Sequence, residues 1–350
     1  MKNLSWFNKF IFLLNMVLTL VTFVGYVLPF LAPKLFPLLS VLTLFLPTLL
    51  IFNCLFVFYW AIQLKRQILL SGILLLIGMP FISKFYKFGR ESVPIDVSDF
   101  TIMSYNVRYF NLYDWIDDDV EKNIQDFFVQ KKPDILCIQE FYTKNRLDFS
   151  DYPYQYIFHI DEGKGNKSKR MAQTIFSKFP IINKGDIDFE NSSNVAIYAD
   201  ILIGKDTVRV YNIHLQSISI SRDIHEEVDQ SKSEIIFYRI SKAFKMQQLQ
   251  AELIKEHKKQ CAFPIIICGD MNNSAFSYVY RSIRGSLLDC FEEKGSGLGS
   301  TYPYKYYPAR IDYIFADKRL KIKSFKNFTG FVNSDHLPIM SRLSFDTDLN

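Results

Sequence analysis

Six short motifs after residue 100 combine carboxylates, amides and imidazoles in an order that could build one catalytic site. Each lies at or just past the end of a short apolar run rich in β-forming residues. Carboxylate and amide oxygens suit a divalent cation such as Mg²⁺, and histidine can move a proton near neutral pH. Together they predict metal-assisted hydrolysis of a phosphoester. The motifs are Ser104-Tyr-Asn106-Val, Gln139-Glu140, Asn212-Ile-His214-Leu, Gly269-Asp270-Met-Asn272, Arg310-Ile-Asp312-Tyr and Ser334-Asp335-His336.

Glu140 ends the apolar run DILCIQE and suits the role of main metal ligand. A charged side chain at the end of so apolar a strand would be costly to bury without a partner. A divalent cation would supply that partner and would also neutralise phosphate oxygens. The simpler alternative is a carboxylate that caps a loop. The presence of the other five motifs in the same chain makes this alternative less favoured.

Asp270 and Asn272 follow the apolar run PIIICG, where Gly269 permits a sharp turn that aims both side chains at one point. The Asn could hold a phosphate oxygen or a water, and the Asp could orient that water or accept its proton. The alternative is an ordinary Asx turn, which these residue types favour.

His214 and His336 are two of only five histidines in the chain. A histidine near neutrality can act as an acid or a base. Each would need a carboxylate to fix its tautomer, and Asp312 and Asp335 are the candidates. A lone histidine at a strand end is more often structural, but two of them beside strand-end acids favour a catalytic role.

Charge divides the chain into two parts. The first 90 of the 350 residues contain no Asp or Glu and eight Lys or Arg. Removing those eight from the 41 Lys and Arg leaves 33 against 36 acids, so the remainder carries a net charge of about −3. Overall charge therefore does not favour nucleic-acid binding by the larger part. The five cysteines have no disulfide or zinc spacing.

We expect residues 1–90 to form a membrane anchor with two or three transmembrane helices, at about 10–31, 37–62 and 68–85. The third segment is the shortest and could cross the bilayer or re-enter it. A cleaved signal peptide is a poor alternative, because further apolar runs follow and no small-residue cleavage site is evident. Residues 91–99 would then be a linker.

The side of the membrane depends on whether the third segment crosses. With three crossings, four basic residues lie on each side, so the positive-inside rule hardly distinguishes the two orientations. The first helix and the Lys65-Arg66 loop favour an internal N-terminus, which would place the large domain outside the cytoplasm. Two crossings would place it inside. We expect an integral protein of a bacterial inner membrane with an extracytoplasmic large domain.

Residues 100–346 alternate short strands and helices, which predicts a layered α/β domain with packed sheets. Apolar periodicity predicts one helix at 114–131 and another at 233–257. The apolar face of the second would comprise Ile236, Ile240, Phe244, Leu249 and Leu253. No internal repeat is visible.

Taken in order, the motifs resemble the endonuclease/exonuclease/phosphatase superfamily, which groups DNase I-like nucleases, abasic-site endonucleases, neutral sphingomyelinases and inositol-polyphosphate 5-phosphatases. The resemblance covers residues 100–343. It implies a DNase I-like, four-layer αββα sandwich, preceded here by transmembrane helices, and Mg²⁺ as cofactor with Mn²⁺ as a substitute. The matching segments are TIMSYNVRYFN, DILCIQEF, MAQTIFSKFPI, VYNIHLQS, IIICGDMNNS, GSTYPYKYYPARIDYIFAD and SDHLPIMSRL.

By matching position, the resemblance implies that Asn106 and Glu140 help to hold the metal and that Asp335 lies at the edge of its site. Some nucleases of the family carry a carboxylate two residues after the Asn, where this chain has Arg108. Metal binding would then rest more heavily on Glu140, or Arg108 would contact phosphate directly. Further basic residues expected at the substrate are Lys169, Arg170 and Arg310.

The resemblance also implies how the remaining residues share the reaction. Asp270 and Asn272 would position the attacking water and the phosphate. Asp312 would orient His336, which acts on the phosphate or the water, and His214 would stand near the leaving group.

These inferences favour a membrane-anchored, Mg²⁺-dependent hydrolase of phosphodiesters that resembles a nuclease. The substrate could equally be a lipid headgroup or an inositol phosphate, since one fold hosts all of these activities. A hypothesis of another class is a non-catalytic, membrane-tethered binding domain, which predicts a broken site. Apart from the substrate and the membrane, no obligate protein partner is evident from the sequence.

Overall fold

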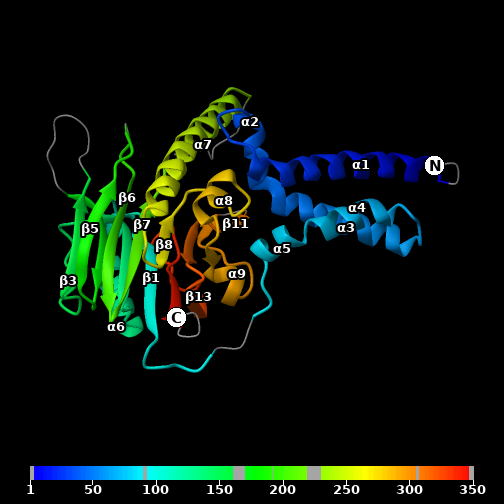
Figure 1. Cartoon of the computed structure of the whole chain (residues 1–350). Helices are drawn as coiled ribbons and strands as arrows, with labels where there is room; N and C mark the ends of the chain where they lie inside the picture. Colours follow the sequence, from blue (N-terminus) through cyan, green and yellow to red (C-terminus); the bar gives the residue numbers. More distant parts are fainter. Residues whose placement is uncertain are drawn as a thin grey trace. The chain divides into compact units, whose positions relative to one another are not determined.

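The computed structural model describes residues 4–89, 93–160, 170–190, 192–218, 230–304 and 307–346. The chain divides into two compact units (Figure 1). The helical unit comprises Met1–Tyr86, Ile218–Gln248 and Ser274–Arg281. The sandwich unit comprises Lys87–Ser217, Leu249–Asn273 and Ser282–Asn350. The helical unit thus includes two segments from beyond residue 100.

The N-terminal helices of the helical unit are apolar on most of their surface. Segments Trp6–Phe30 and Pro37–Ile62 are each long and apolar enough to cross a membrane, and the pair α4–α5, bent by 68°, could be a third crossing. The elements are α1 (Trp6–Val27), η1 (Leu28–Phe30), α2 (Pro37–Ser40), η2 (Val41–Phe45), α3 (Leu46–Ile62), α4 (Ile68–Ile77) and α5 (Met79–Phe85).

A buried polar network joins α1, α3 and α4. The Asn15 side-chain amide donates to the Ser71 hydroxyl at 2.6 Å, and that hydroxyl donates to the Asn53 side-chain oxygen at 2.9 Å. Asn53 also donates to the Thr22 hydroxyl at 2.9 Å, and the Trp60 indole donates to Asn15 at 3.0 Å. Among apolar helices, interhelical hydrogen bonds of this kind specify which faces meet.

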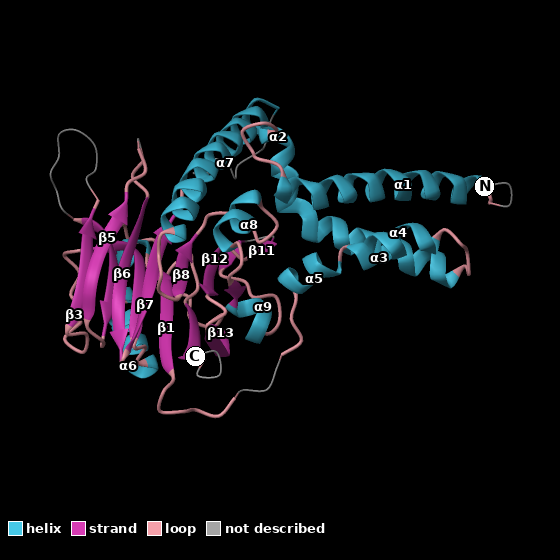
Figure 2. Ribbon diagram, in the orientation of Figure 1, coloured by secondary structure: helices cyan, strands magenta, loops and turns pink. Residues whose placement is uncertain are grey.

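The sandwich unit contains two six-stranded sheets (Figure 2). Their strand orders are β13-β14-β1-β2-β4-β3 and β5-β6-β7-β8-β12-β9. Strands of the first sheet are β1 (Phe100–Asn106), β2 (Ile135–Tyr142), β3 (Tyr154–His159), β4 (Met171–Ser177), β13 (Leu320–Asn327) and β14 (Ile339–Phe345). Strands of the second are β5 (Ile181–Ile187), β6 (Val195–Ile203), β7 (Asp206–His214), β8 (Ile265–Asp270), β9 (Leu288–Asp289) and β12 (Asp312–Ala316).

Each sheet has one parallel pair at its centre, β1 with β2 and β7 with β8, and all its other pairs are antiparallel. Aliphatic side chains from both sheets form the core between them, including Ile102, Ile135, Ile197 and Ile266. Two parallel pairs that end in polar residues therefore face each other across one core.

Helices cover the outer faces of the two sheets and complete the αββα layers. Helix α6 (Val120–Lys131) packs Ile124, Phe127 and Phe128 onto β1 and β2. The last turns of α7 (Gln230–Lys259) contact the second sheet, where His257 Nδ1 lies 2.9 Å from the Tyr211 hydroxyl. Short elements complete the fold: η3 (Arg108–Asn111), α8 (Tyr278–Arg284), α9 (Cys290–Lys294), β10 (Tyr302–Tyr304) and β11 (Tyr307–Ala309).

The structure corrects two details predicted from periodicity. Helix α6 begins at Val120 rather than at 114, because the Asp119 side chain caps it by accepting from the Lys122 N–H. The predicted apolar face of α7 is wrong at Leu249 and Leu253, which are 56% and 46% exposed. Gln250 is buried instead, where its carbonyl accepts the Gln216 N–H at 2.9 Å.

Candidate active site

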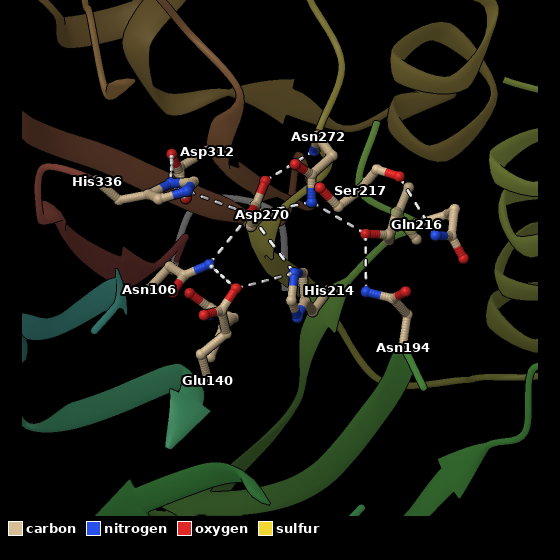
Figure 3. A network of polar contacts seen from close by, with 12 residues as sticks. Asn106, Glu140, Asn194, His214, Gln216, Ser217, Asp270, Asn272, Asp312 and His336 are labelled. Carbon is tan, nitrogen blue, oxygen red and sulfur yellow. Dashed lines mark hydrogen bonds and ion pairs between the residues drawn. The ribbon is translucent and has the colours of Figure 1, made fainter. Parts of the chain in front are cut away.

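The strand ends bring the six motifs to one edge of the sandwich. Because β7 and β8 are parallel and in register, His214 lies directly opposite Asp270, and the antiparallel β12 places Asp312 on the other side of Asp270. In the first sheet, Asn106 pairs with Gln139, so Glu140 follows immediately beside it. Polar ends of strands from both sheets therefore meet in one cluster (Figure 3).

Unusual backbone conformations aim three of these strand ends. Glu140 has a φ of +52° at a bulge between Ile138 and Phe141, and Asn272 has a φ of +49°. Gly269 has a φ of +133°, and a Cβ there would lie 2.0 Å from the Ile213 carbonyl oxygen. Left-handed backbone at non-glycine residues costs about 1–3 kcal/mol each and clusters at functional sites. The strain at Glu140 and Asn272 marks these positions as ones that the surrounding structure holds.

His336 and Asp312 are buried in the cluster and are hydrogen-bonded to each other. Its Nδ1 lies 2.9 and 3.2 Å from the two Asp312 oxygens, and its Nε2 lies 3.6 Å from Asp270 Oδ2. Burial alone would lower the pKa of His336, but the carboxylates of Asp312 and Asp270 outweigh it and raise the pKa to about 10. His336 is therefore a cation at neutral pH, with its Nε2–H directed toward Asp270.

Asp270 is fully buried and connects the two histidines. Its Oδ1 accepts the Asn272 backbone N–H at 2.7 Å, and its Oδ2 accepts the Asn272 side-chain amide at 3.2 Å. Burial raises the pKa of Asp270 to about 6, against the opposing charge of His336. A carboxylate whose pKa is close to neutral can exchange a proton under working conditions.

His214 and Glu140 occupy the opposite wall. His214 Nε2 lies 3.7 Å from Asp270 Oδ2 and 3.8 Å from Glu140 Oε1. Burial lowers the pKa of His214, so its imidazole is neutral at pH 7, whereas burial raises the pKa of Glu140. The two histidines of the cluster thus differ in charge, and only the one paired with Asp312 is a cation.

Asn106 ties the two carboxylates together. Its amide NH₂ donates to Glu140 Oε1 and Asp270 Oδ2, both at 3.2 Å, and its oxygen accepts the Arg108 N–H at 3.1 Å. Rotation of the amide by about 180° would turn its oxygen toward the carboxylates. Asn106 could therefore offer either a donor or a ligand oxygen to whatever lies between them.

Two groups of residues could hold a divalent cation. Ligand atoms of Asp270, Asp312 and His336 all lie within 4.8 Å of one another. In that group, however, His336 Nδ1 and Asp312 Oδ2 already pair with each other at 2.9 Å, and a metal ligand must be deprotonated. Glu140 and Asn106 offer the oxygens that Mg²⁺ prefers. Burial penalises the negative charges of Glu140 and Asp270, a deficit that a cation beside them would relieve, so the oxygen-rich side fits Mg²⁺ better.

Arg108 and Asp335 form the rim on the side of β1. The Arg108 guanidinium lies 3.1 Å from Asp335 Oδ2 and 3.8 Å from the centre of the Trp115 ring. Arg108 also starts a run of four residues with positive φ, which ends at Asn111. The structure thus supports Arg108 by a carboxylate and an aromatic face, while leaving about a fifth of its side chain exposed.

The other basic residues expected at the substrate lie elsewhere or outside the described residues. Arg310 is buried and forms an ion pair with Asp289 at 2.7 Å, between the rings of Phe291 and Tyr313. This buried ion pair gives Arg310 a structural role within the sandwich rather than a position at the substrate. Arg170 is exposed at the start of β4, and Lys169 lies outside the described residues.

A buried amide network behind the cluster has no counterpart in the sequence-based prediction. The Gln139 side-chain amide donates to the Asn212 side-chain oxygen at 2.6 Å and to the Ser104 hydroxyl at 3.1 Å. The Asn212 amide donates to the carbonyls of Ile138 and Thr174, at 3.0 and 2.8 Å. Both residues belong to the motifs, where their places beside Glu140 and His214 were the only signal. The network links the two sheets beneath the site.

A second support holds the loop that follows His214. The Leu215 carbonyl accepts two side-chain amides, from Asn272 and from Asn194, both at 3.0 Å. Figure 3 shows these two asparagines. Asn194 stands just before β6, and sequence reasoning assigned it no part in the site. Asn194 and Asn272 thus hold the loop after β7 through one shared acceptor, the Leu215 carbonyl.

The αββα layers and this cluster of acids, amides and imidazoles define the class of the protein as a DNase I-like metal-dependent hydrolase. Residues 103–336 match the Endonuclease/Exonuclease/phosphatase family, and the chain belongs to that family. Residues 8–85 match a domain of unknown function (DUF8431). No curated protein matches the chain.

Solved structures of the same family share the fold. An endonuclease/exonuclease/phosphatase from Beutenbergia cavernae is 14% identical, with 71% of this chain and 72% of that chain covered and a TM-score of 0.53. One from Bacteroides vulgatus is 17% identical, covering 71% and 99%, with a TM-score of 0.52. D. rerio TDP2 is 16% identical, covering 71% and 99%, with a TM-score of 0.50. At these identities the likeness establishes the fold.

Proposed function

We propose that the chain is a membrane-anchored, Mg²⁺-dependent phosphodiesterase. The observation that carries the proposal is the arrangement of Asp312, His336, Asp270 and His214, in which two histidines flank one buried carboxylate at 3.6 and 3.7 Å and Asp312 orients one of them. Burial and neighbouring charges shift the pKa values of these groups in opposite directions, and such shifts cluster at sites of proton transfer.

Glu140 and Asn106 would hold the metal, with Asp335 at its edge, and Mn²⁺ would substitute for Mg²⁺. When bound, the cation would neutralise a phosphate oxygen and lower the pKa of water. The chain's own contribution is to fix Glu140 at its bulge and to place the Asn106 amide within 3.2 Å of it. Arg108, supported by Asp335 and Trp115, would contact a further phosphate oxygen.

The other side of the cluster would handle the water and the phosphate. Asp270 would orient the attacking water and accept its proton, as its pKa of about 6 permits. Asn272 would hold a phosphate oxygen. The His336 cation, oriented by Asp312, would stabilise negative charge on the phosphate. Neutral His214 would donate a hydrogen bond near the leaving oxygen.

A nucleic acid is the first candidate substrate, since D. rerio TDP2, which shares the fold, has been solved with a single-stranded DNA product. Arg170 and Lys169 would then contact its backbone. A lipid headgroup is the second candidate, favoured by the two helices that are long and apolar enough to cross a membrane. An inositol phosphate would use the same groups.

We propose further that residues 1–90 anchor the enzyme, that 91–99 link it, and that 100–346 form the hydrolase. If α4 and α5 together complete a third crossing, the N-terminus and the hydrolase lie on opposite sides. With the N-terminus in the cytoplasm, as the first helix and the Lys65-Arg66 loop favour, the hydrolase lies outside the cytoplasm of a bacterial cell. A reporter fused after Asn350 tests this: alkaline phosphatase should be active there, and activity of a cytoplasmic reporter alone would refute it.

Hydrolysis by the full chain in detergent tests the activity itself. Plasmid DNA, RNA, sphingomyelin, inositol phosphates and a chromogenic phosphodiester would be offered with Mg²⁺, Mn²⁺ or EDTA. Turnover should require the metal and be lost in Glu140→Gln and His336→Ala, but not in the surface control Glu190→Gln. A folded protein that binds no metal and turns over none of these would favour the non-catalytic binding domain.

A further inference from the structure

The first half of α7 carries an exposed stripe of basic and apolar side chains within the helical unit. Ile235, Tyr238, Lys242 and Lys245 recur at spacings of three and four residues, so they share one face of the helix. All four are exposed, Ile235 by 48% and Tyr238 by 68%. Residues 235–248 contain no Asp or Glu. We call these four residues the α7 stripe.

The opposite face of the same helix packs onto the start of the second apolar segment and the connection before it. Ile240 and Phe244 form a buried cluster with Val41 of η2. One turn further on, the Gln248 carbonyl accepts the Lys34 backbone N–H at 2.9 Å. Figure 1 shows the N-terminal end of α7 beside α2. The helix is therefore fixed against the connection between the two segments that could each cross a bilayer.

The same end of the helical unit bears further cations among exposed apolar groups. Lys34 is exposed between exposed Phe30 and Leu35, and Arg281 lies 4.3 Å over the Phe30 ring. Lysine and arginine beside aromatic and aliphatic side chains are typical of the level at which a protein leaves the hydrocarbon and meets lipid headgroups. The α7 stripe continues this composition onto a helix that does not itself cross.

We propose that the α7 stripe rests on the headgroups of an anionic bilayer leaflet, with its two lysines paired to lipid phosphates and its Ile and Tyr at the acyl boundary. The proposal depends on the membrane location proposed above. The charge of the stripe and its continuity with the apolar helices argue for a lipid surface. Ile235 and Tyr238 share a face with Lys242 and Lys245, so one lipid surface would meet both the apolar and the basic side chains.

This contact would act on segments that the chain connects directly to the catalytic strands. The stretch Ile218–Gln248 follows β7, which ends at His214, and Ser274–Arg281 follows Asn272 by two residues. Both stretches belong to the helical unit. Lipid bound by the α7 stripe would thus hold the helix that follows β7 in the chain.

Hydrogen exchange of the full chain in nanodiscs tests the proposal. The discs would contain zwitterionic phosphatidylcholine alone or mixed with anionic phosphatidylglycerol. Amides of 235–248 should exchange about tenfold more slowly in the anionic discs, because each Lys or Arg near a charged surface adds to the attraction, and high salt should abolish the difference.

Charge reversal supplies the matched comparison. Lys242→Glu/Lys245→Glu should lose the lipid dependence, and Lys242→Gln/Lys245→Gln should retain a reduced part of it. The control Lys205→Glu/Lys255→Glu, which reverses two exposed lysines of the sandwich unit, should keep it. Equal exchange in both kinds of disc would overturn the proposal alone. A chain that does not enter discs at all would overturn the membrane location as well, while metal-dependent hydrolysis would still stand.

Discussion

The two compact units each bury a cluster of polar side chains, and the clusters differ in kind. In the helical unit the members are amides, hydroxyls and an indole, joined by hydrogen bonds of 2.6–3.0 Å. In the sandwich unit the central members are carboxylates and imidazoles, and several of their contacts exceed 3.5 Å. The first cluster is neutral and closed, and the second is charged and loosely paired.

This difference separates a structural cluster from a candidate catalytic one. A neutral network among apolar helices contributes roughly 0.6–2 kcal/mol per hydrogen bond and leaves no group that titrates near neutral pH. A buried group of charges is a weak source of stability, because desolvation offsets the attraction. The sandwich unit keeps such a group at the ends of strained strands, which is expected where the charges serve a reaction.

Asp312→Asn should have the largest effect on activity. The substitution keeps the shape of the side chain but removes the charge that holds His336 protonated and oriented. We expect the turnover number to fall by about 10²–10⁴-fold, the usual contribution of a positioned acid or base, with a smaller change in KM. Steady-state kinetics on the best substrate of the panel gives the answer.

The matched control for this change is Asp188→Asn, an exposed aspartate in the loop after β5. It should leave the kinetics unchanged. If both variants retained full turnover, the pairing of Asp312 with His336 would be structural and the proposed division of roles would be wrong.

Asn212→Leu should reduce activity by about tenfold and also destabilise the sandwich. It leaves the carbonyls of Ile138 and Thr174 and the Gln139 amide without their buried partner, each at a cost of about 1–3 kcal/mol. Thermal unfolding and kinetics on the same samples separate the two effects. Val210→Leu in the same strand is the packing control; an equal loss there would assign the effect to core volume.

Much of the site was predictable because its residues end strands. Asp270 and Asn272 follow an apolar run through Gly269, and the positive φ of that glycine is what the sequence pattern required. The register of β7, β8 and β12 then puts His214, Asp270 and Asp312 side by side. The positions of the strand ends predict this proximity, since the residues that end neighbouring parallel strands lie at the same edge of a sheet.

What the sequence left open depends on partners far along the chain. Arg310 stands in a motif, yet its partner Asp289 is 21 residues earlier, and no local pattern connects the two. Leu249 and Leu253 have helical spacing, but tertiary contacts bury Gln250 because its amide satisfies a loop N–H. Periodicity predicts which residues share a face of a helix. It does not predict which polar residue of the helix is buried by a hydrogen bond to a neighbouring loop.

The pH dependence of the stability of the metal-free protein tests the charges of the cluster in the sandwich unit. The pKa of His336 is raised to about 10 in the folded protein, so its contribution to stability is complete below about pH 6.5 and is lost as pH rises toward 10. The raised pKa of Asp270 acts in the same direction, with stability falling as pH rises from about 4 through 6.

Melting temperatures measured in EDTA should therefore fall by several degrees between pH 7 and pH 10. The fall should be smaller in His336→Gln, which has no proton to lose. A metal-free protein whose stability rises over this range would show that His336 is neutral when folded.

Asn53→Leu should have the smallest effect on chemistry and tests the neutral side of the comparison. It deprives the Ser71 hydroxyl of its acceptor and the Thr22 hydroxyl of its donor among buried helices. We expect about 1–2 kcal/mol of lost stability in detergent, with turnover of a water-soluble phosphodiester unchanged. Phe52→Leu, on the exposed side of the same helix, is the control and should melt like the parent. If Asn53→Leu instead abolished turnover while the helices still melted normally, the polar network of the helical unit would be coupled to catalysis, and the contrast between a structural cluster and a catalytic one would not hold.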